Sequence, residues 1–118
     1  MEGKKIYIQS EKMVFAALCD MMEMQKGKER VNNYSRGELH FDIWLFGVYW
    51  KLRFKVEWLD EGRCCVKLSI RESGKYDDDE KDELKETLER MITSEFSLLD
   101  NMLLIVSPLA TTFAGVEN

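Results

Sequence analysis

The feature that most constrains the fold is the stretch from Leu39 to Arg71, in which apolar side chains alternate with others in three successive runs. The apolar series comprises Leu39, Phe41, Ile43 and Leu45; Val48, Trp50, Leu52, Phe54, Val56 and Trp58; and Cys64, Val66, Leu68 and Ile70. Because successive side chains of a strand point to opposite faces, a period of two is typical of half-buried antiparallel strands. We therefore predict a three-strand meander with one strongly apolar face.

Two short turns between these runs predict the register of the meander. A two-residue turn at Phe46-Gly47 and a type I turn with a glycine bulge at Asp60-Glu61-Gly62 fit the spacing. The expected pairs are Leu45 with Val48, Ile43 with Trp50, Phe41 with Leu52, Leu59 with Arg63, Trp58 with Cys64 and Val56 with Val66. A slip by one residue would expose about fourteen apolar side chains, each worth ~1.5–3 kcal/mol, which strongly favours this register.

An amphipathic helix is predicted before the meander. Ser10 is a suitable N-cap for a helix that runs to about Lys26, with Gly27 at its end. A helical wheel places these residues on one face: Val14, Ala17, Leu18, Met21, Met22 and Met24. The opposite face carries Lys12, Ala16, Asp20 and Glu23.

A second, long helix is predicted after the meander, from about Asp78 to Val106. The acidic run Asp77–Glu80 favours a helix N-terminus, and Ser107-Pro108 ends the helix. Its apolar stripe comprises Leu84, Leu88, Met91, Ile92, Leu98, Leu99, Met102 and Ile105. At 1.5 Å per residue the helix would be roughly 40 Å long, enough to cross a small sheet.

The remaining segments complete an α+β fold of order β-α-β-β-β-α. Ile6 and Ile8 alternate with polar neighbours, which predicts a short first strand at the edge of the sheet. Residues 28–37 are predicted as loop, and a short strand at Val31–Tyr34 is the alternative. The antiparallel sheet then has three to five strands, and both helices pack on its one apolar face. We expect a single domain over residues 1–108 and a flexible tail over residues 109–118.

Length, charge and hydropathy narrow the classes of partner. The 118 residues suffice for one domain, and the net charge of −5 divides into +2 over residues 1–37, zero over 38–73 and −7 over 74–118. Nucleic acid is disfavoured as a partner because phosphate binding depends on an excess of Lys and Arg.

The chain turns polar at Gln9, and the apolar stretch Leu98–Val106 is shorter than the ~20 residues of a membrane span. We expect a cytoplasmic protein without a secretory signal or membrane span.

No motif predicts a metal, a cofactor or a catalytic centre. Cys64 and Cys65 are adjacent in a predicted strand and would point to opposite faces, so with Cys19 they are interpreted as reduced thiols that act as small hydrophobic residues. The acidic run Asp77–Glu83 lacks the spacing of a calcium loop. His40 lies two residues from Asp42, but no nucleophile accompanies them, so a solvent-facing histidine is the simpler interpretation.

The element order resembles that of the START/Bet v 1-like helix-grip superfamily. The elements that carry the likeness are the strand Ile6-Tyr7-Ile8, the helix through Val14–Leu18, the strands from Leu39 to Ile70 and the helix from Asp78 to Val106. The chain has fewer strands than that superfamily, which implies a reduced helix-grip. The resemblance implies a pocket for an apolar small molecule between the sheet and the long helix.

Glu95 is the most unusual residue of the long helix, because it falls in the middle of the apolar stripe. A carboxylate in such a place is paired, protonated or directed into a cavity. One interpretation makes Glu95, together with Trp50 and Trp58, the lining of a ligand pocket. The other is that the helix overhangs the sheet at that point and leaves Glu95 in water or beside Lys or Arg.

The face of the meander that points away from the helices, here the outer face, is the second candidate site. Trp44, Phe46 and Tyr49 gather at one hairpin end, and Lys51, Arg53 and Lys55 follow them, with Lys55 directly opposite Lys67. Exposed aromatic residues beside basic ones favour an interface, for which the acidic segment Asp77–Glu89, in cis or from a second copy, is one complement. A solvated sheet face is the plainer interpretation, and single-stranded RNA is disfavoured by the net charge.

These patterns lead to two hypotheses of function. The first is a non-catalytic interaction module that forms a homodimer, or binds an acidic protein partner, through the outer face. The alternative is a carrier of a small apolar ligand, with a pocket between the sheet and the C-terminal helix. Neither hypothesis includes a cofactor or a metal.

Overall fold

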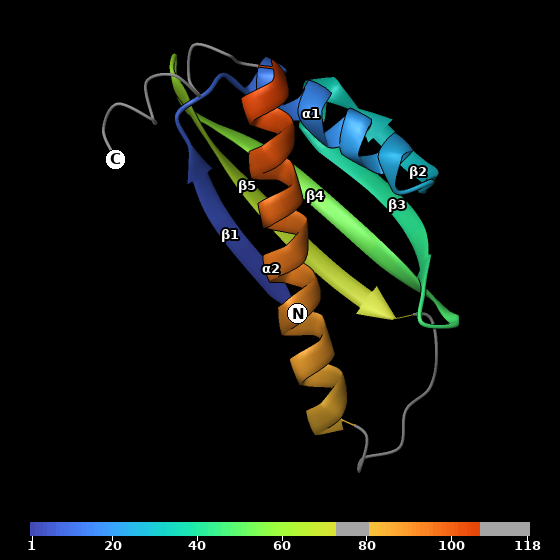
Figure 1. The fold of residues 1–118 in the computed structure, drawn as a ribbon. Coiled ribbons are helices and arrows are strands. Elements are labelled where there is room, and N and C mark those ends of the chain that lie inside the picture. The colour runs from blue at the N-terminus through green and yellow to red at the C-terminus, as the bar shows by residue number, and fades with distance from the viewer. Residues whose placement is uncertain (73–80, 107–118) are drawn as a thin grey trace.

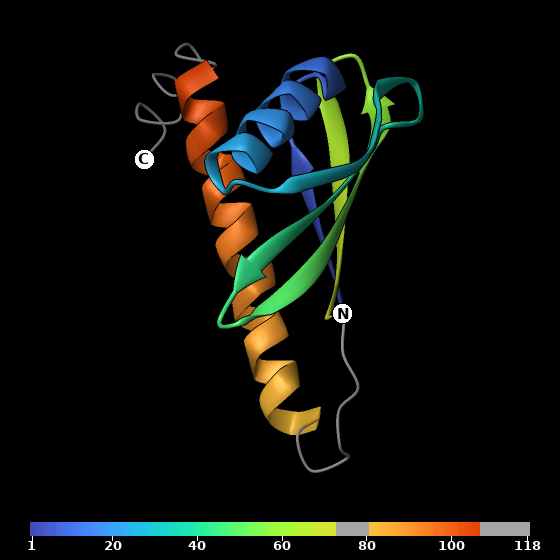
Figure 2. The same ribbon diagram turned by 90° about the vertical axis from the view of Figure 1, so that its right-hand side faces the viewer.

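A computed structural model describes residues 1–72 and 81–106 of the chain. Its elements are β1 (Glu2–Tyr7), α1 (Glu11–Met24), β2 (Lys28–Asn33), a 3-10 turn (Tyr34–Arg36), β3 (Glu38–Leu45), β4 (Val48–Asp60), β5 (Arg63–Glu72) and α2 (Lys81–Val106). The five strands form one antiparallel sheet in the order β1-β5-β4-β3-β2, and both helices cover the same face of it (Figure 1, Figure 2). The predicted α+β class, with the first strand at the edge and both helices on one face, is confirmed.

The meander forms in the predicted register. Ile43 pairs with Trp50, Phe41 with Leu52, and Val56 with Val66, and these inward side chains are buried. At the β3–β4 turn both Phe46 and Gly47 have positive φ, 56° and 79°, the backbone twist that two-residue hairpin turns favour.

The β4–β5 turn differs from the prediction. Asp60, not Leu59, pairs with Arg63, and the register shifts between Trp58 and Asp60. The Asp60 carboxylate explains the tighter turn, because it accepts hydrogen bonds from the Gly62 backbone N–H at 3.0 Å and from Arg63 Nε at 2.7 Å.

The prediction of a loop over residues 28–37 is wrong, because this segment contains β2 and the 3-10 turn. β2 pairs along β3, and its side chains are mostly exposed, so backbone hydrogen bonding rather than apolar alternation forms the strand. Arg30 Nε lies 2.8 Å from the carboxylate of Asp42 on β3. Asn33 caps the 3-10 turn, which Gly37 ends with a φ of 67°.

The N-terminal helix is confirmed, with Ser10 Oγ accepting a hydrogen bond from the Met13 backbone N–H at 3.3 Å. Its predicted buried face is correct except for Met24, which is 55% exposed because it is the last residue of α1 before the chain turns away. Phe15 is buried in addition. The alternation in the first strand predicts β1 but not its orientation: Tyr7 is buried, whereas Ile6 and Ile8 are exposed.

The long helix α2 crosses the sheet diagonally, and its lower half extends toward the β3–β4 hairpin end (Figure 1). Leu88, Met91 and Leu99 of the predicted stripe are buried, and so are Phe96 and Leu103, which the stripe omits. α2 packs closely on β1: a Cβ at Gly3 would lie 2.5 Å from Ile92 Cγ2. The predicted cap Asp77–Glu80 and the tail 109–118 lie outside the described residues.

Candidate functional site

A cleft of about 840 Å³ lies between the β3–β4 hairpin, the end of α1 and the first half of α2. It is partly open to solvent, and its volume falls within the roughly 300–1,000 Å³ of small-molecule sites. Its lining comprises Gln25, Leu45, Phe46, Val48, Trp50, Leu84, Thr87, Arg90, Met91, Ser94 and Glu95.

Regular local structure explains how these residues come together. Leu84, Met91 and Glu95 recur at spacings that place them on one face of α2. The two strands of the hairpin provide the opposite wall. Trp50 is only 3% exposed, and its Nε1 donates a hydrogen bond to the Leu45 carbonyl at 3.0 Å, which fixes the orientation of the indole.

Glu95 lies in the floor of this cleft and is only 4% exposed. Its Oε2 accepts a hydrogen bond of 3.0 Å from Gln25 Nε2, a neutral donor at the end of α1. Burial raises the pKa of Glu95 to about 7, and the hydrogen bond from Gln25 opposes that rise only in part. No Lys or Arg among the described side chains forms an ion pair with Glu95. Near neutral pH this carboxyl group therefore exists in both protonation states.

Two of the three predicted ligand-binding residues meet in the cleft. Glu95 and Trp50 both line it, whereas Trp58 does not and is 60% exposed. Trp58 still pairs with Cys64, as predicted, but it lies near the opposite end of β4 from Trp50. At about 3.3 Å per residue the two indoles are too far apart along the strand to line one cleft. The prediction that Trp58 faces the same pocket as Glu95 is therefore wrong for this structure.

Other lining residues were not identified from the sequence. Their helical spacing could have predicted some of them, because side chains three or four positions apart share one side of a helix. On α2 these residues are Leu84, Thr87, Met91 and Ser94. The sequence carries no comparable signal for Gln25, because only the packing of α1 against α2 brings it to Glu95.

Phe46 occupies an unfavourable position at the mouth of the cleft. Its φ of 56° lies in the left-handed region, and its side chain is 81% exposed. For residues other than Gly, Asn and Asp this region costs roughly 1–2 kcal/mol, and Asn-Gly is the sequence that such hairpin turns favour. Backbone strain of this kind is often found at binding sites.

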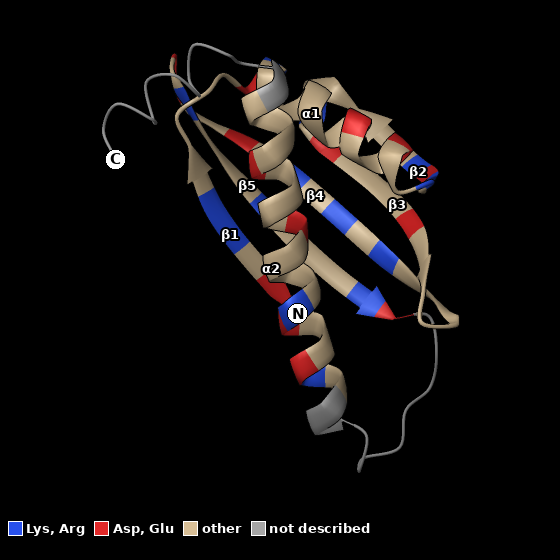
Figure 3. Ribbon diagram, in the orientation of Figure 1, with Lys and Arg blue, Asp and Glu red and all other residues tan. Residues whose placement is uncertain are grey.

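The three aromatic side chains predicted for the outer face are exposed, but Phe46, at the turn, also lines the cleft on the helix side. Trp44, Phe46 and Tyr49 are 59%, 81% and 51% exposed, and the rings of Trp44 and Tyr49 meet edge to face at 4.6 Å. Lys51 and Arg53 are exposed and Lys55 is half-buried. Figure 3 shows the basic bands along β4 and β5.

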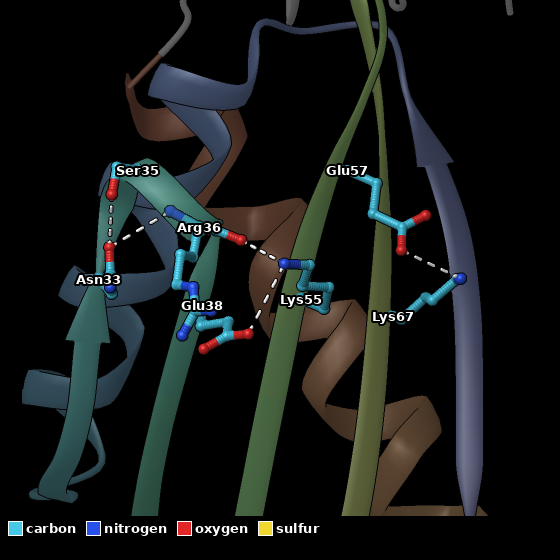
Figure 4. A network of polar contacts seen from close by, with 7 residues as sticks. All are labelled: Asn33, Ser35, Arg36, Glu38, Lys55, Glu57 and Lys67. Carbon is cyan, nitrogen blue, oxygen red and sulfur yellow. Dashed lines mark hydrogen bonds and ion pairs between the residues drawn. The ribbon is translucent and has the colours of Figure 1, made fainter.

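The basic side chains of the outer face are partly balanced by acidic ones. Lys55 lies opposite Lys67, as predicted, but Lys55 Nζ lies 3.7 Å from Glu38 and donates a hydrogen bond to the Arg36 carbonyl (Figure 4). Lys67 Nζ lies 3.1 Å from Glu57. Neighbouring carboxylates therefore relieve the like-charge repulsion, and the need for an acidic partner is smaller than the sequence alone indicates.

The described residues contain no group of His, Cys, Asp and Glu that could hold a metal ion. Cys19, Cys64 and Cys65 are unpaired thiols. Asp42 pairs with Arg30 rather than with His40, and burial beside Arg53 lowers the pKa of His40. Neither helix in the described part of the chain is long and apolar enough to span a membrane.

Comparison with known proteins identifies the fold but no family. No family model matches the chain, and no curated protein sequence does either. Among solved structures the chain is similar to TTHA0849 from Thermus thermophilus, with a TM-score of 0.57, 10% sequence identity, and coverage of 91% of this chain and 98% of that one. The resemblance in element order to the START/Bet v 1-like helix-grip superfamily is confirmed, in a form with five strands.

Weaker likenesses extend to two further structures. The Zhui aromatase/cyclase from Streptomyces sp. R1128 has a TM-score of 0.46 at 14% identity and covers 90% of this chain and 92% of its own. Ara h 8.0201 has a TM-score of 0.48 at 12% identity and covers 88% and 96%. At such identities the likeness concerns the fold alone.

Proposed function

We propose that this protein binds a small, largely apolar ligand in the cleft between the β3–β4 hairpin and α2. The observation that carries the proposal is the cleft itself, a space of about 840 Å³ bounded by the sheet and the long helix. It lies between the two elements where the sequence predicts a pocket, and two predicted residues, Trp50 and Glu95, line it.

The chemistry of the lining supports an apolar ligand with a polar end. Leu45, Val48, Leu84 and Met91 provide apolar walls, which favour a ligand by removing its apolar surface from water. The polar side chains beside these walls are Gln25, Thr87, Arg90, Ser94 and Glu95. Ligand sites typically combine apolar walls with polar groups that orient the ligand. The three unpaired thiols agree with the predicted cytoplasmic location, where thiols stay reduced.

A pair of tryptophan substitutions on adjacent residues of α2 tests this function. Ser94 lines the cleft and Thr93 does not, although both are exposed on the same helix. We expect the fluorescent probe N-phenyl-1-naphthylamine to bind the wild-type protein, and Ser94→Trp to weaken that binding at least about tenfold by filling the cleft. Thr93→Trp should bind as the wild type does. Equal binding by the two variants, or no binding by the wild type, would contradict the proposal.

Self-association through the outer face is the second candidate function. The exposure of Trp44, Phe46 and Tyr49 at one hairpin favours it, because solvent-exposed aromatic clusters often mark interfaces. It predicts a concentration-dependent dimer in sedimentation that Trp44→Ala or Arg53→Glu weakens. A strict monomer whose sedimentation is the same in both variants would rule this candidate out.

A further inference from the structure

We propose that the ligand of the cleft carries a protonated amine, which binds the carboxylate of Glu95. This inference rests on the proposed function and specifies the chemistry of the ligand at the same site. It follows from the position of Glu95, the charges that surround it and the order in which polar and apolar groups line the cleft.

The first step is the incomplete satisfaction of Glu95 within the protein. An ionised carboxylate has room for about four hydrogen bonds, and the described residues provide one, from Gln25 Nε2. A buried carboxylate is stable as an ion only when a cation or several donors face it. Glu95 lines the cleft, so a ligand in the cleft can reach it and provide what the protein does not.

The second step is the distribution of charge around Glu95. The end of α1 contributes the neutral Gln25, and the hairpin contributes Leu45, Phe46, Val48 and Trp50, none of which carries a charge. Among the described lining residues Arg90 is the only cation, and it is exposed and shares a surface depression on α2 with Glu86 and Glu89.

An amine therefore suits the floor of the cleft better than an anionic group does. An anionic head would meet a like charge at Glu95, whereas an ammonium group would form a charge-assisted hydrogen bond in a largely water-excluded place. The apolar body of the ligand would lie along Met91 and Leu84, which line the cleft from the same helix. The ligand class is thus a small alkylamine or arylalkylamine, which is protonated near neutral pH.

Three ligands with the same chain test the inference: octylamine, octanol and octanoate. We expect wild-type protein to bind octylamine at least about tenfold more tightly than octanol at about pH 8, and octanoate most weakly of the three. Glu95→Gln should bind octylamine and octanol with similar affinity. Glu89→Gln, which removes the same charge from an exposed position of α2, should keep the preference for the amine.

The pH dependence provides an independent readout. Octylamine affinity should fall as the pH is lowered through about 7, because protonation of Glu95 removes the charge, and octanol affinity should change little. Equal affinities for amine and alcohol in the wild type, or an amine preference that persists in Glu95→Gln, would overturn this inference. The proposed function would still be supported in that case, because octanol would bind. Failure of all three ligands to bind would overturn both.

Discussion

Replacing Glu95 with glutamine is expected to stabilise the fold near neutral and alkaline pH. The pKa of Glu95 rises from an ordinary 4.5 to about 7 on folding, so the folded state holds a proton that the unfolded state has already lost. The contribution of Glu95 to the free energy of unfolding is therefore fully present below pH 4.5. It falls as the pH rises from there to about 7, and it does not fall further at higher pH. With about 1.4 kcal/mol for each pKa unit, the loss at about pH 8 is of order 3 kcal/mol.

Urea unfolding of wild type and Glu95→Gln across this range measures the effect. Glutamine keeps the size of the side chain and cannot ionise, so the variant should be more stable than wild type by up to about 3 kcal/mol at about pH 8, and by much less at about pH 4. Glu89→Gln is the control, because Glu89 is exposed. If the free energies of unfolding of wild type and Glu95→Gln differ by the same amount at every pH, the assignment of Glu95 as a buried, proton-binding carboxyl group is contradicted.

Replacing Phe46 with asparagine is expected to change stability and binding in opposite directions. Asparagine followed by Gly47 suits the positive φ values of this turn, and Phe46 is largely exposed, so the variant should gain about 1 kcal/mol of stability. The loss of the aromatic ring from the mouth of the cleft should weaken the binding of N-phenyl-1-naphthylamine by about tenfold.

Parallel measurements on Phe46→Asn separate these effects. Thermal unfolding reports the strain of the turn, and a fluorescence titration reports the binding. Trp44→Ala is the matched control, because Trp44 is an exposed aromatic residue of the same hairpin that does not line the cleft. A variant that is less stable than wild type would show that Phe46 supports the fold rather than the cleft. Unchanged probe binding would exclude it from the site.

Two locally unfavourable features thus occur at one place in the molecule. Glu95 is a carboxyl group buried without a cation among the described residues, and Phe46 is an aromatic residue in a left-handed turn; both line the same cleft. Sequences that specify a fold are usually consistent at every level, and departures concentrate at functional sites. This coincidence favours a binding function for the cleft over a role in stability alone.

The sequence predicts the central sheet well because the burial of one face determines both period and register. Ile43 and Trp50 are found opposite each other because any other pairing would expose a row of apolar side chains. β2 was predicted only as the alternative of a short strand at Val31–Tyr34, because an edge strand with exposed side chains needs no apolar alternation. Met24 was misassigned because a helical wheel does not show where the helix ends against its neighbour.

The candidate site was predicted through Trp50, which follows the apolar alternation of its strand, and through Glu95, which contradicts its own surroundings in the sequence. Glu95 stands out as a carboxylate within an apolar stripe, and it is indeed buried in the cleft. Gln25 is an ordinary polar residue at the end of a helix, and its contact with Glu95 joins residues 70 positions apart. Trp58 has the correct alternation but lies near the opposite end of β4 from Trp50, and alternation alone does not show how far along the strand the cleft extends.

The central claim, that the cleft binds a small apolar ligand, is tested most directly by NMR. Protein labelled at its methionine methyl groups is titrated with octanol, an uncharged ligand. Met91 lines the cleft, whereas Met13 lies on α1 away from it. If the cleft is the binding site, the Met91 methyl resonance will shift and saturate at one ligand per protein while the Met13 resonance stays in place. An unchanged Met91 resonance, or equal and unsaturable shifts of both, would contradict it.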